Sequence, residues 1–517
     1  MWLDQTRNLV IYDTPDPTKI TSVVPGSKHV ANGYVACPNT LHNLQLLRWL
    51  GFPVPSPMEG NYDWPGQYTP FNAQRVTANF LAVNPRAFVF NDLGSGKTLS
   101  ALWAADFLMG GKSTPPAQGP FRALVVAPLS TLNRVWGDAI FRNLLGRRTH
   151  LVVYGDARKR REILARPADF YIINYDGVNV IRDALAARPD LRMVIIDEAS
   201  AYRDFRTRRH KLARQLLGPK DYLWLMTGTP TPNGPTDAYG LAKLVNNAFG
   251  ESFTSYQSRV MTKVSQFKWV PRASAHKMAN DLMRPSVRFA ISDCVDLPPC
   301  TTQSRDVELS PDQNKAYKEM KRQLQITVKN GQPITATNEA VLRLKLIQIA
   351  CGAVYGPDRE INHIDAAPRI AALRETMEQC REKIIVFAGL TSVLNLLYKE
   401  LKDYSREIIN GAVTQSKRSD VFRAFENSPN PRVLLADPAT MAHGLSLVAA
   451  TTVIWYAPTD RTELYLQANK RIHRPGQVNA TTIVNLVATP VEKEIFRRLE
   501  ANETMQGLIL ALAKGEI

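Results

Sequence analysis

Short, continuous runs of β-branched and aromatic residues recur through most of this 517-residue chain, and stretches with apolar residues at helical spacing separate them. In the first half of the chain the runs are AFVF, ALVVAP, HLVVY, FYIINY, MVIIDEA and YLWLMTG. Continuous apolar runs of this length indicate strands buried on both faces, which alternate with helices in parallel sheets. The pattern predicts an α/β fold over about residues 62–240, with a parallel sheet wound with helices.

The same alternation resumes near residue 366, with the runs KIIVFAG, SREIING, PRVLLAD, TTVIWYAP and TTIVNLVA. It predicts a second α/β lobe of the same class. Between about 241 and 365 the pattern is helical and more polar, as in SPDQNKAYKEMKRQLQ and TNEAVLRLKLIQIACG, and it predicts a helical insertion.

Residues 1–61 contain seven prolines and one convincing helical pattern, NTLHNLQLLRWLG. Asn39 or Thr40 would cap that helix and Gly51 would end it. We expect the rest of this segment to be irregular. The predicted domains are an accessory module at 1–61, a first lobe at 62–292 with a helical extension after 241, a linker and helical protrusion at 293–365, and a second lobe at 366–517.

Positive charge exceeds negative charge, because 64 Lys and Arg residues against 47 Asp and Glu residues leave a formal net charge of +17. An excess of this size fits a polyanionic partner, and nucleic acid is the first candidate. Basic residues concentrate in RKRR at 158–161 and in RDFRTRRHK at 203–211. Either run can instead be a solvated helix face that keeps the protein soluble.

The sequence gives no sign of a membrane or secretory segment. No apolar run approaches the roughly 20 residues that span a bilayer, and the opening MWLDQTRNLVIYDTPD lacks a basic stretch followed by an apolar one. We therefore expect a cytoplasmic protein without membrane contact. Its five cysteines are scattered with no CxxC pair, which suits reduced thiols and no structural metal.

The stretch NDLGSGKTLSAL, at 91–102, joins the AFVF run to a helical pattern. Backbone N–H groups of a glycine loop and of a helix start can converge on phosphate oxygens, while a lysine reaches the terminal phosphates and a hydroxyl binds Mg²⁺. A simple glycine turn is the alternative, because Asn91 stands where the longer motif has its first glycine. The predicted ATP-binding residues here are Gly94, Ser95, Gly96, Lys97 and Thr98, and Thr98 is a predicted ligand of the magnesium ion.

A phosphate loop needs an acidic partner, and MVIIDEAS presents Asp197 and Glu198 at the end of a buried strand. Asp197 would bind nucleotide and metal, directly or through water, and Glu198 would orient and deprotonate the attacking water. Standing alone, the pair could be a helix cap. The next run ends in TGTP, where the hydroxyls of Thr227 and Thr229 would contact the acidic segment or form a local turn.

The order GKT, DExx and a Ser/Thr-rich third motif resembles the first lobe of superfamily-two helicases and translocases. In ELYLQANKRIHRPGQ, at 463–477, Arg471 and Arg474 are three residues apart and would share one helix face. Two fixed guanidiniums can stabilise charge on a transferring phosphoryl group, although a basic helix end in solvent is the alternative. The string QAxxRxHRxGQ resembles the sixth motif of Swi/Snf-type ATPases, the double-stranded DNA translocases of that superfamily.

The resemblance extends over about residues 65–500. YTPFNAQRVTANFL resembles the opening motif, LVVAPLSTLNRVW with Trp136 resembles motif Ia, and FYIINYDGV resembles motif Ib. EKIIVFAGL, INGAVTQSKRSDVFRAF and VLLADPATMAHGLSLVAATTVIWY resemble motif IV, the segment after it, and motif V. These matches imply that Gln74 reads the adenine edge and that Gly444 also binds ATP. They imply DNA contacts at Ser130, Thr131, Asn174, Tyr175, Gly411 and Ser446.

This family resemblance implies two RecA-like lobes with the ATP site between them, so that lobe closure belongs to the catalytic step. It also implies a monomer of the compact phage or bacterial type, acting at the nucleoid on double-stranded DNA, branched or forked duplexes included. The chain departs from the family at Ser200, where His is common, and at Met441, Ala442 and Ser446 of motif V.

We therefore expect a DNA-dependent ATPase that translocates on double-stranded DNA and remodels DNA or protein–DNA complexes. The alternatives are a strand-separating or branch-migrating helicase of replication, recombination or repair, an RNA-directed relative, and an ATP-liganded DNA clamp without turnover. Tyr34, Arg48 and Trp49 of the first segment would bind branched DNA or a partner protein, or pack on the first lobe.

Overall fold

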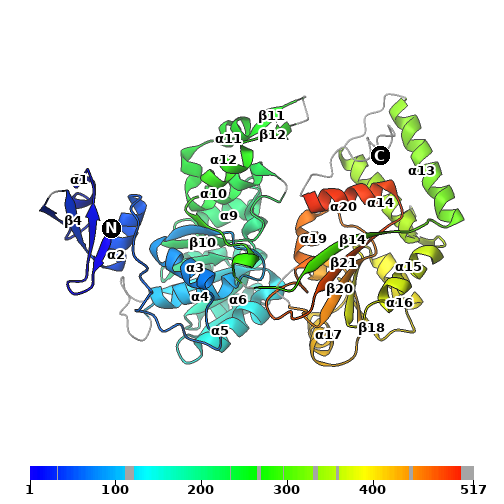
Figure 1. Cartoon of the computed structure of the whole chain (residues 1–517). Coiled ribbons are helices and arrows are strands. Elements are labelled where there is room, and N and C mark those ends of the chain that lie inside the picture. Colours follow the sequence, from blue (N-terminus) through cyan, green and yellow to red (C-terminus); the bar gives the residue numbers. More distant parts are fainter. Residues whose placement is uncertain are drawn as a thin grey trace. The chain divides into compact units, whose positions relative to one another are not determined.

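The computed structural model describes residues 1–31, 33–110, 121–232, 234–264, 269–294, 296–329, 336–356, 360–441 and 446–501. The chain divides into two compact units, Met1–Val295 and Asp296–Ile517 (Figure 1). Each unit contains its own parallel sheet, and this confirms the predicted fold class of two α/β lobes.

A seven-stranded parallel sheet forms the centre of the first unit, in the order β13-β5-β10-β9-β6-β8-β7. Its strands are β5 (Arg86–Val89), β6 (Arg122–Ala127), β7 (His150–Val153), β8 (Phe170–Asn174), β9 (Leu191–Ile196), β10 (Tyr222–Met226) and β13 (Ser286–Val287). The first six are the strands that the apolar runs predicted. The seventh has only two residues, which is too short for any run to reveal it.

Helices and short turns connect these strands and extend the unit. They are α3 (Asn72–Val83), α4 (Lys97–Leu108), η1 (Leu129–Thr131), η2 (Leu132–Gly137), α5 (Asp138–Leu144), α6 (Ala157–Ala165), α7 (Tyr175–Val180), α8 (Arg182–Ala186), η3 (Ala199–Tyr202), α9 (Arg208–Leu216), η4 (Pro235–Asp237), α10 (Ala238–Val245), η5 (Asn247–Gly250), α11 (Phe253–Val260), α12 (Ala275–Leu282) and η6 (Ile291–Asp293). A small hairpin, β11 (Met261–Lys263) and β12 (Trp269–Pro271), lies within the segment that was expected to be helical.

Two hydrophobic layers cover the two faces of this sheet. Successive residues of a strand point to opposite faces, and the layers follow that alternation. Phe88 and Leu124 belong to the layer that includes residues of α9, α10 and α12, whereas Val89 and Val125 belong to the layer that includes residues of α3, α4 and α5. Burial on both faces leaves the ends of the strands as the places where polar side chains can gather.

The N-terminal segment is not irregular, and that expectation was wrong. It forms a four-stranded antiparallel sheet in the order β1-β2-β4-β3. Its elements are β1 (Trp2–Asp4), β2 (Leu9–Asp13), α1 (Thr18–Thr21), β3 (Lys28–Ala31), β4 (Tyr34–Pro38) and α2 (Leu41–Trp49). The strands have three to five residues each, so their alternation is too brief to stand out between the prolines.

Helix α2 confirms the one helix that was predicted in this segment, with Thr40 as its cap. Val10, Tyr12 and Leu47 form a small core together with Val83 of α3. Gln45 of α2 donates to the carbonyl of Ala82 at 2.9 Å. The segment therefore packs on the first lobe, whereas Trp49 remains 78% exposed.

A six-stranded parallel sheet forms the second unit, in the order β14-β21-β20-β17-β19-β18. Its strands are β14 (Cys300–Asp306), β17 (Lys383–Phe387), β18 (Arg406–Ile409), β19 (Val433–Ala436), β20 (Ala450–Trp455) and β21 (Thr481–Val487). The apolar runs predicted all of these except β14. That edge strand reads CTTQSRD and is almost wholly exposed, so it pairs with β21 through backbone bonds without an apolar pattern.

Eight helices and a hairpin accompany this sheet in the described part of the unit. They are α13 (Pro311–Lys329), α14 (Ala336–Cys351), β15 (Ala353–Tyr355), β16 (Ile361–His363), α15 (Ala367–Glu378), α16 (Thr391–Glu400), α17 (Gln415–Asn427), α18 (Pro438–Met441), α19 (Thr462–Asn469) and α20 (Pro490–Ala501). Among the helices of both units, none in the described segments is long and apolar enough to cross a bilayer. The five cysteines are all described, and each is a free thiol.

A buried ion pair joins the helices and strands of the second unit. Arg369 of α15 is 1% exposed, and its guanidinium lies 2.8 Å from the carboxylate of Glu492 in α20. The same guanidinium donates at 3.0 Å to the carbonyls of Tyr456, after β20, and Leu486, in β21. Glu492 also accepts a bond from the hydroxyl of Thr489 at 3.1 Å. Arg369 thus holds two strands and two helices together.

We predict that Arg369→Met lowers the free energy of unfolding of the second unit by about 3–5 kcal/mol, because it leaves the carboxylate of Glu492 buried without its partner. Urea unfolding combined with hydrogen exchange of the β20 and β21 peptides measures this loss. Arg374→Met on the same helix is the control. Arg374 and Asp403 are paired at 3.2 Å but are 31% and 60% exposed, so we expect a loss of about 0–1 kcal/mol. Equal losses of stability in the two variants would contradict the stabilising role that we assign to the buried Arg369–Glu492 pair.

Candidate functional site

The phosphate-loop candidate folds as a strand, a loop and a helix, as the sequence predicted. Gly94 and Gly96 both adopt left-handed backbone angles, with φ of 87° and 78°, which favour glycine. Lys97 opens α4 and is 8% exposed. Its Nζ donates to the carbonyls of Asn91 at 2.8 Å and Asp92 at 3.0 Å. The ammonium group is therefore held over the loop by backbone oxygens.

Asn91, which replaces the expected glycine, has a structural role. Its side chain donates to the hydroxyl of Thr77 in α3 at 2.8 Å and accepts from the N–H of Phe289 at 3.0 Å. It thereby links the start of the loop to α3 and to the segment after β13. A glycine could make neither bond.

Gln74 lies directly against the phosphate loop. Its Oε1 accepts from the N–H of Phe71 at 2.9 Å, and the side chain is 5% exposed. A Cβ atom placed on Gly96 would lie only 1.9 Å from Nε2 of Gln74, so the loop has no room for a side chain there. The structure thus brings together Gln74 and the loop residues Gly94, Ser95, Gly96, Lys97 and Thr98.

Asp197 follows β9 and is held by three hydrogen bonds. Its N–H donates to the carbonyl of Val126 at 2.9 Å. Its carboxylate accepts from Nε1 of the fully buried Trp136 at 3.0 Å and from the N–H of Glu198 at 3.0 Å. Burial raises the pKa of the Asp197 carboxyl, whereas the bond from Trp136 and the charge of Lys97 lower it. Trp136 fixes the direction in which this carboxylate points.

Glu198 occupies a left-handed backbone conformation, with φ of 45° and ψ of 53°. Such a conformation costs a residue with a side chain about 1–3 kcal/mol, and it persists where the surroundings enforce it. Tyr175 supplies part of that enforcement, because its hydroxyl donates to the carbonyl of Asp197 at 2.8 Å and of Glu198 at 3.2 Å. The tyrosine at the start of α7 therefore clamps the turn that carries both acids.

Residues of the third motif pack next to the phosphate loop. The hydroxyl of Thr227 accepts from the N–H of Thr229 at 3.1 Å, which is a local turn within the motif. A Cβ atom on Gly228 would lie 3.2 Å from the side chain of Leu93, so the motif and the loop are in close contact.

Four predicted DNA contacts lie at the carboxyl ends of the neighbouring strands β6 and β8. Ser130 is half-buried, and the hydroxyl of Thr131 donates to the carbonyl of Pro128 at 2.9 Å. Asn174 accepts from Arg160 at 3.0 Å. Because the carboxyl ends of parallel strands share one edge, the phosphate loop, the acids and these residues all lie along it.

Arg471 and Arg474 do not share a helix face, and that expectation was wrong. Helix α19 ends at Asn469, and both arginines lie in the turns that follow. Pro475 explains part of this, since the residue before a proline is disfavoured in helical conformation. Arg471 is 5% exposed and Arg474 is half-buried. Burial lowers the pKa of Arg474, and the charge of Glu426 opposes that shift.

The other polar residues of RIHRPGQ fix these turns. The ring of His473 bonds the carbonyl of Pro298 at 2.9 Å. Gln477 donates at 3.0 Å to the carbonyls of Ala450, at the start of β20, and Ile472. In the second unit Gly411 and Ser446 are exposed, and Gly444 lies outside the described residues.

Sequence reasoning missed the functions of Trp136, Tyr175 and Asn91 beside this site. Trp136 stood in a recognised motif but had no assigned partner, and Tyr175 was expected only to contact DNA. No spacing rule connects Trp136 and Tyr175 to the acids, because each contact joins the ends of two different strands that lie far apart in the sequence.

Comparison with known proteins identifies the family. The model of the SNF2-related domain matches residues 79–351, and the model of the helicase conserved C-terminal domain matches residues 368–476. Putative protein p41 of Acyrthosiphon pisum secondary endosymbiont phage 1 is 26% identical over 475 residues, which are 86% of this chain and 99% of that protein.

Longer relatives match over the same core. SWI/SNF-related matrix-associated actin-dependent regulator of chromatin subfamily A-like protein 1 of Xenopus laevis is 24% identical over 82% of this chain and 42% of its own length. An uncharacterized ATP-dependent helicase of Mycoplasma pneumoniae is 24% identical over 80% of this chain and 39% of its own length. The chain thus spans about two fifths of these two relatives.

A solved structure, the Sulfolobus solfataricus SWI2/SNF2 ATPase core in complex with dsDNA, is 18% identical and covers 88% of this chain and 95% of that chain, with a TM-score of 0.40. The family assignment comes from the sequence models, since the SNF2-related model alone spans residues 79–351 of 517. The chain belongs to the SNF2-related family of helicase-like ATPases and is an ATP-hydrolysing enzyme.

Proposed function

We propose that this enzyme hydrolyses ATP in response to double-stranded DNA, translocates along the duplex and thereby remodels DNA or protein–DNA complexes. The observation that carries the proposal is the convergence of Gln74, Lys97 and the Asp197–Glu198 turn at one edge of a buried parallel sheet. That convergence supports a nucleotide site of the kind the family uses.

In the proposed mechanism Lys97 leaves the carbonyls of Asn91 and Asp92 and binds the terminal phosphates. Glu198 orients the attacking water and accepts its proton, and Arg471 and Arg474 of the second unit stabilise charge on the transferring group. Thr98 and Asp197 would hold Mg²⁺, which neutralises charge on phosphate oxygens. Two protein oxygens suit Mg²⁺, because this ion usually keeps waters and nucleotide oxygens as its other ligands.

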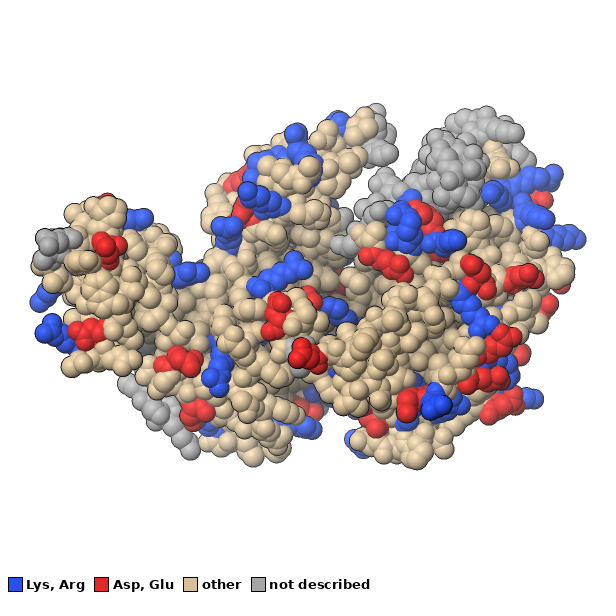
Figure 2. Space-filling model, in the orientation of Figure 1, with Lys and Arg blue, Asp and Glu red and all other residues tan. Residues whose placement is uncertain are grey.

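Duplex DNA as the partner is supported by charge and by the position of Ser130, Thr131, Asn174 and Tyr175. The net charge of +17 favours a polyanion. On the face shown in Figure 2, however, Lys and Arg are interspersed with Asp and Glu over both units. This mixed distribution of charged residues would suit a groove that binds the DNA phosphates better than it would suit a broad basic patch. We propose a monomer that acts in the cytoplasm at the nucleoid, on simple, branched or forked duplexes.

We predict that duplex and forked DNA stimulate ATP hydrolysis more than single-stranded DNA or RNA. Contacts to phosphates should make binding independent of sequence, and affinity should fall by about 10³-fold or more between about 50 and 200 mM salt. Phosphate release measured with each nucleic acid tests this, and displacement of a third strand tests translocation. Equal rates with and without duplex would overturn the proposal, and strand separation without triplex displacement would favour a helicase.

We predict that Lys97→Ala and Arg474→Ala each lower kcat by at least about 10³-fold, because each removes a charge that stabilises the transferring phosphoryl group. Affinity for duplex DNA should change less than about threefold, an amount smaller than one lost phosphate contact. Lys493→Ala is the control, since Lys493 is exposed on α20. Loss of DNA binding together with turnover would indicate a role in folding.

We predict that Trp136→Phe raises the Mg²⁺ concentration for half-maximal ATP hydrolysis by about 10-fold to 100-fold, because the Asp197 carboxylate loses the donor that orients it. Trp103→Phe is the matched control. Trp103 is also fully buried, and its indole N–H donates to the carbonyl of Pro65 at 2.9 Å, away from the acids. A magnesium requirement that shifts equally in both variants would show that only packing is affected.

A further inference from the structure

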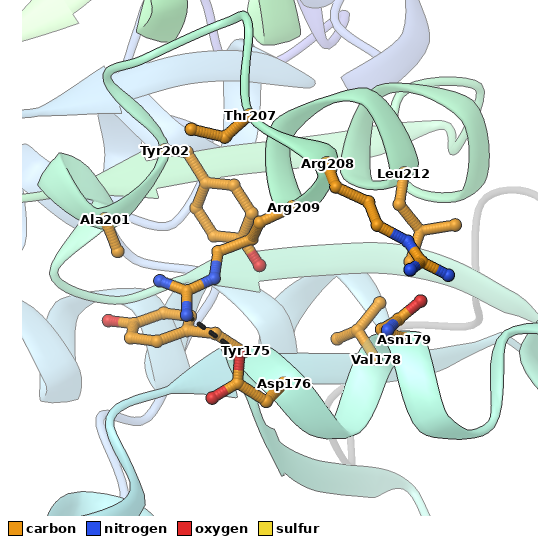
Figure 3. Close-up of a pocket in the computed structure, with 10 residues that line it drawn as sticks. All are labelled: Tyr175, Asp176, Val178, Asn179, Ala201, Tyr202, Thr207, Arg208, Arg209 and Leu212. Atoms are coloured by element: carbon orange, nitrogen blue, oxygen red, sulfur yellow. Dashed lines mark hydrogen bonds and ion pairs between the residues drawn. The ribbon is translucent and has the colours of Figure 1, made fainter.

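A pocket of about 370 Å³ lies in the first unit (Figure 3), and no residue of the phosphate loop lines it. One of its lining residues, Tyr175, bonds the Asp197–Glu198 turn. The pocket is bounded by α7, by η3 and by the first turn of α9. The residues that line it are Tyr175, Asp176, Val178, Asn179, Ala201, Tyr202, Thr207, Arg208, Arg209 and Leu212. From the sequence, Tyr175 was predicted to contact DNA, and Arg208 and Arg209 belong to the basic run at 203–211.

The α9 side of the pocket suits an anion. Thr207 caps the helix by accepting from the N–H of His210 at 3.2 Å. The other N–H groups of a first helical turn have no partner within the helix and form its positive end. The first turn also contributes Arg208 and Arg209, whose guanidiniums match the oxygens of a phosphate group.

Tyr202 provides an independent indication of a ligand. Its side chain is 1% exposed, and its hydroxyl has no hydrogen-bond partner among the residues that the structure describes. Figure 3 shows this hydroxyl pointing in among the side chains of the pocket. A buried hydroxyl without a partner costs about 1–3 kcal/mol. Burial also raises the pKa of Tyr202, so the group remains a donor.

The charges of the pocket leave one arginine available. Arg209 is paired with Asp176 at 2.8 Å, and its guanidinium lies 5.6 Å from the ring centre of Tyr175 (Figure 3). Arg208 is exposed, and no ion pair of Arg208 occurs within the described segments. Two positive charges and one negative charge therefore face the cavity, which favours a single anionic group.

Tyr175 connects the pocket to the acids. Its ring forms one wall and packs edge-to-face on Tyr202, with 5.6 Å between ring centres. Its hydroxyl bonds the carbonyls of Asp197 and Glu198, as described above. A ligand that draws Arg209 away from Tyr175 would therefore act on the residue that clamps the strained Glu198 turn.

We propose that this pocket binds one phosphate group of a nucleic-acid strand and that Tyr175 transmits this binding to Glu198. The strand is favoured over a free phosphate because Arg208 is exposed and the lining residue Tyr175 directly follows β8 at the strand-end edge. The inference rests on the proposed function, because it names a subsite through which DNA would stimulate ATP hydrolysis.

The first test compares duplex affinity across salt concentrations for two pocket variants and a control. The double variant Arg208→Gln/Arg209→Gln should weaken binding at least about tenfold and reduce the slope of log affinity against log salt by about one. Tyr202→Phe should weaken binding about tenfold without changing the slope, because it removes an uncharged donor to an anion. Arg206→Gln is the matched control, since Arg206 is 72% exposed, pairs with Asp204 and does not line the pocket.

The second test separates binding from signalling. Tyr175→Phe keeps the ring that lines the pocket and removes the hydroxyl that bonds the Asp197 and Glu198 carbonyls, so the DNA-stimulated kcat should fall about tenfold, a larger loss than the loss of duplex affinity in the same variant. A purely structural effect would change stability and both constants together. Thermal unfolding of every variant, compared with Arg206→Gln, identifies loss of the fold.

Distinct results would overturn the two levels of the proposal. If the double variant and Arg206→Gln have the same affinity and salt slope, the pocket is not a strand subsite, even where duplex DNA stimulates the wild-type enzyme. If calorimetry shows that the double variant loses binding of inorganic pyrophosphate but keeps duplex affinity, the pocket takes a free phosphate compound instead. If duplex DNA binds the wild-type enzyme but does not stimulate ATP hydrolysis, the proposed function is wrong. The duplex affinities of the variants would still show whether the pocket binds a strand.

Discussion

Burial of both faces of a parallel sheet is the constraint on which the rest of this structure depends. The inner strands of the first sheet are covered by two hydrophobic layers, so polar side chains are not accommodated along the length of these strands. Such side chains can appear only where the strands end, and in a parallel sheet the carboxyl ends share one edge. Lys97, Asp197, Thr227 and Asn174 follow or end four different strands, and for that reason they lie along the same edge.

The same constraint explains which parts of the fold were predictable. Strands buried on both faces must be continuously apolar, and the eleven runs identified in the sequence are all strands in the structure. Strand β14 is bound only by backbone hydrogen bonds at an exposed edge, so its side chains are free to be polar. The N-terminal strands alternate over three to five residues, which is too little sequence for a period to emerge between prolines.

The site was predictable where a motif fixes local geometry and unpredictable where tertiary contacts do so. The glycine loop and the acid pair depend on neighbouring residues, and their placement beside one another follows from the sheet. Trp136 bonds the carboxylate of Asp197, and the hydroxyl of Tyr175 bonds the carbonyls of Asp197 and Glu198. Each of these bonds joins residues at the ends of two different strands. The spacing of Arg471 and Arg474 wrongly predicted that they share a helix face. Helix α19 ends before both residues, and Pro475 and the hydrogen bonds of Gln477 hold this segment in turns.

Two energetically unfavourable features lie on either side of the aromatic pair formed by Tyr175 and Tyr202. On one side, Tyr175 holds Glu198 in a left-handed conformation; on the other, the hydroxyl of Tyr202 is buried without a partner among the described residues. Neither feature stabilises the fold, although both tyrosines adjoin a buried hydrophobic core. A site that is costly without a ligand gains more when a ligand supplies the missing bond. Because the two tyrosine rings are in contact, a bond made at Tyr202 and the conformation held by Tyr175 are physically linked.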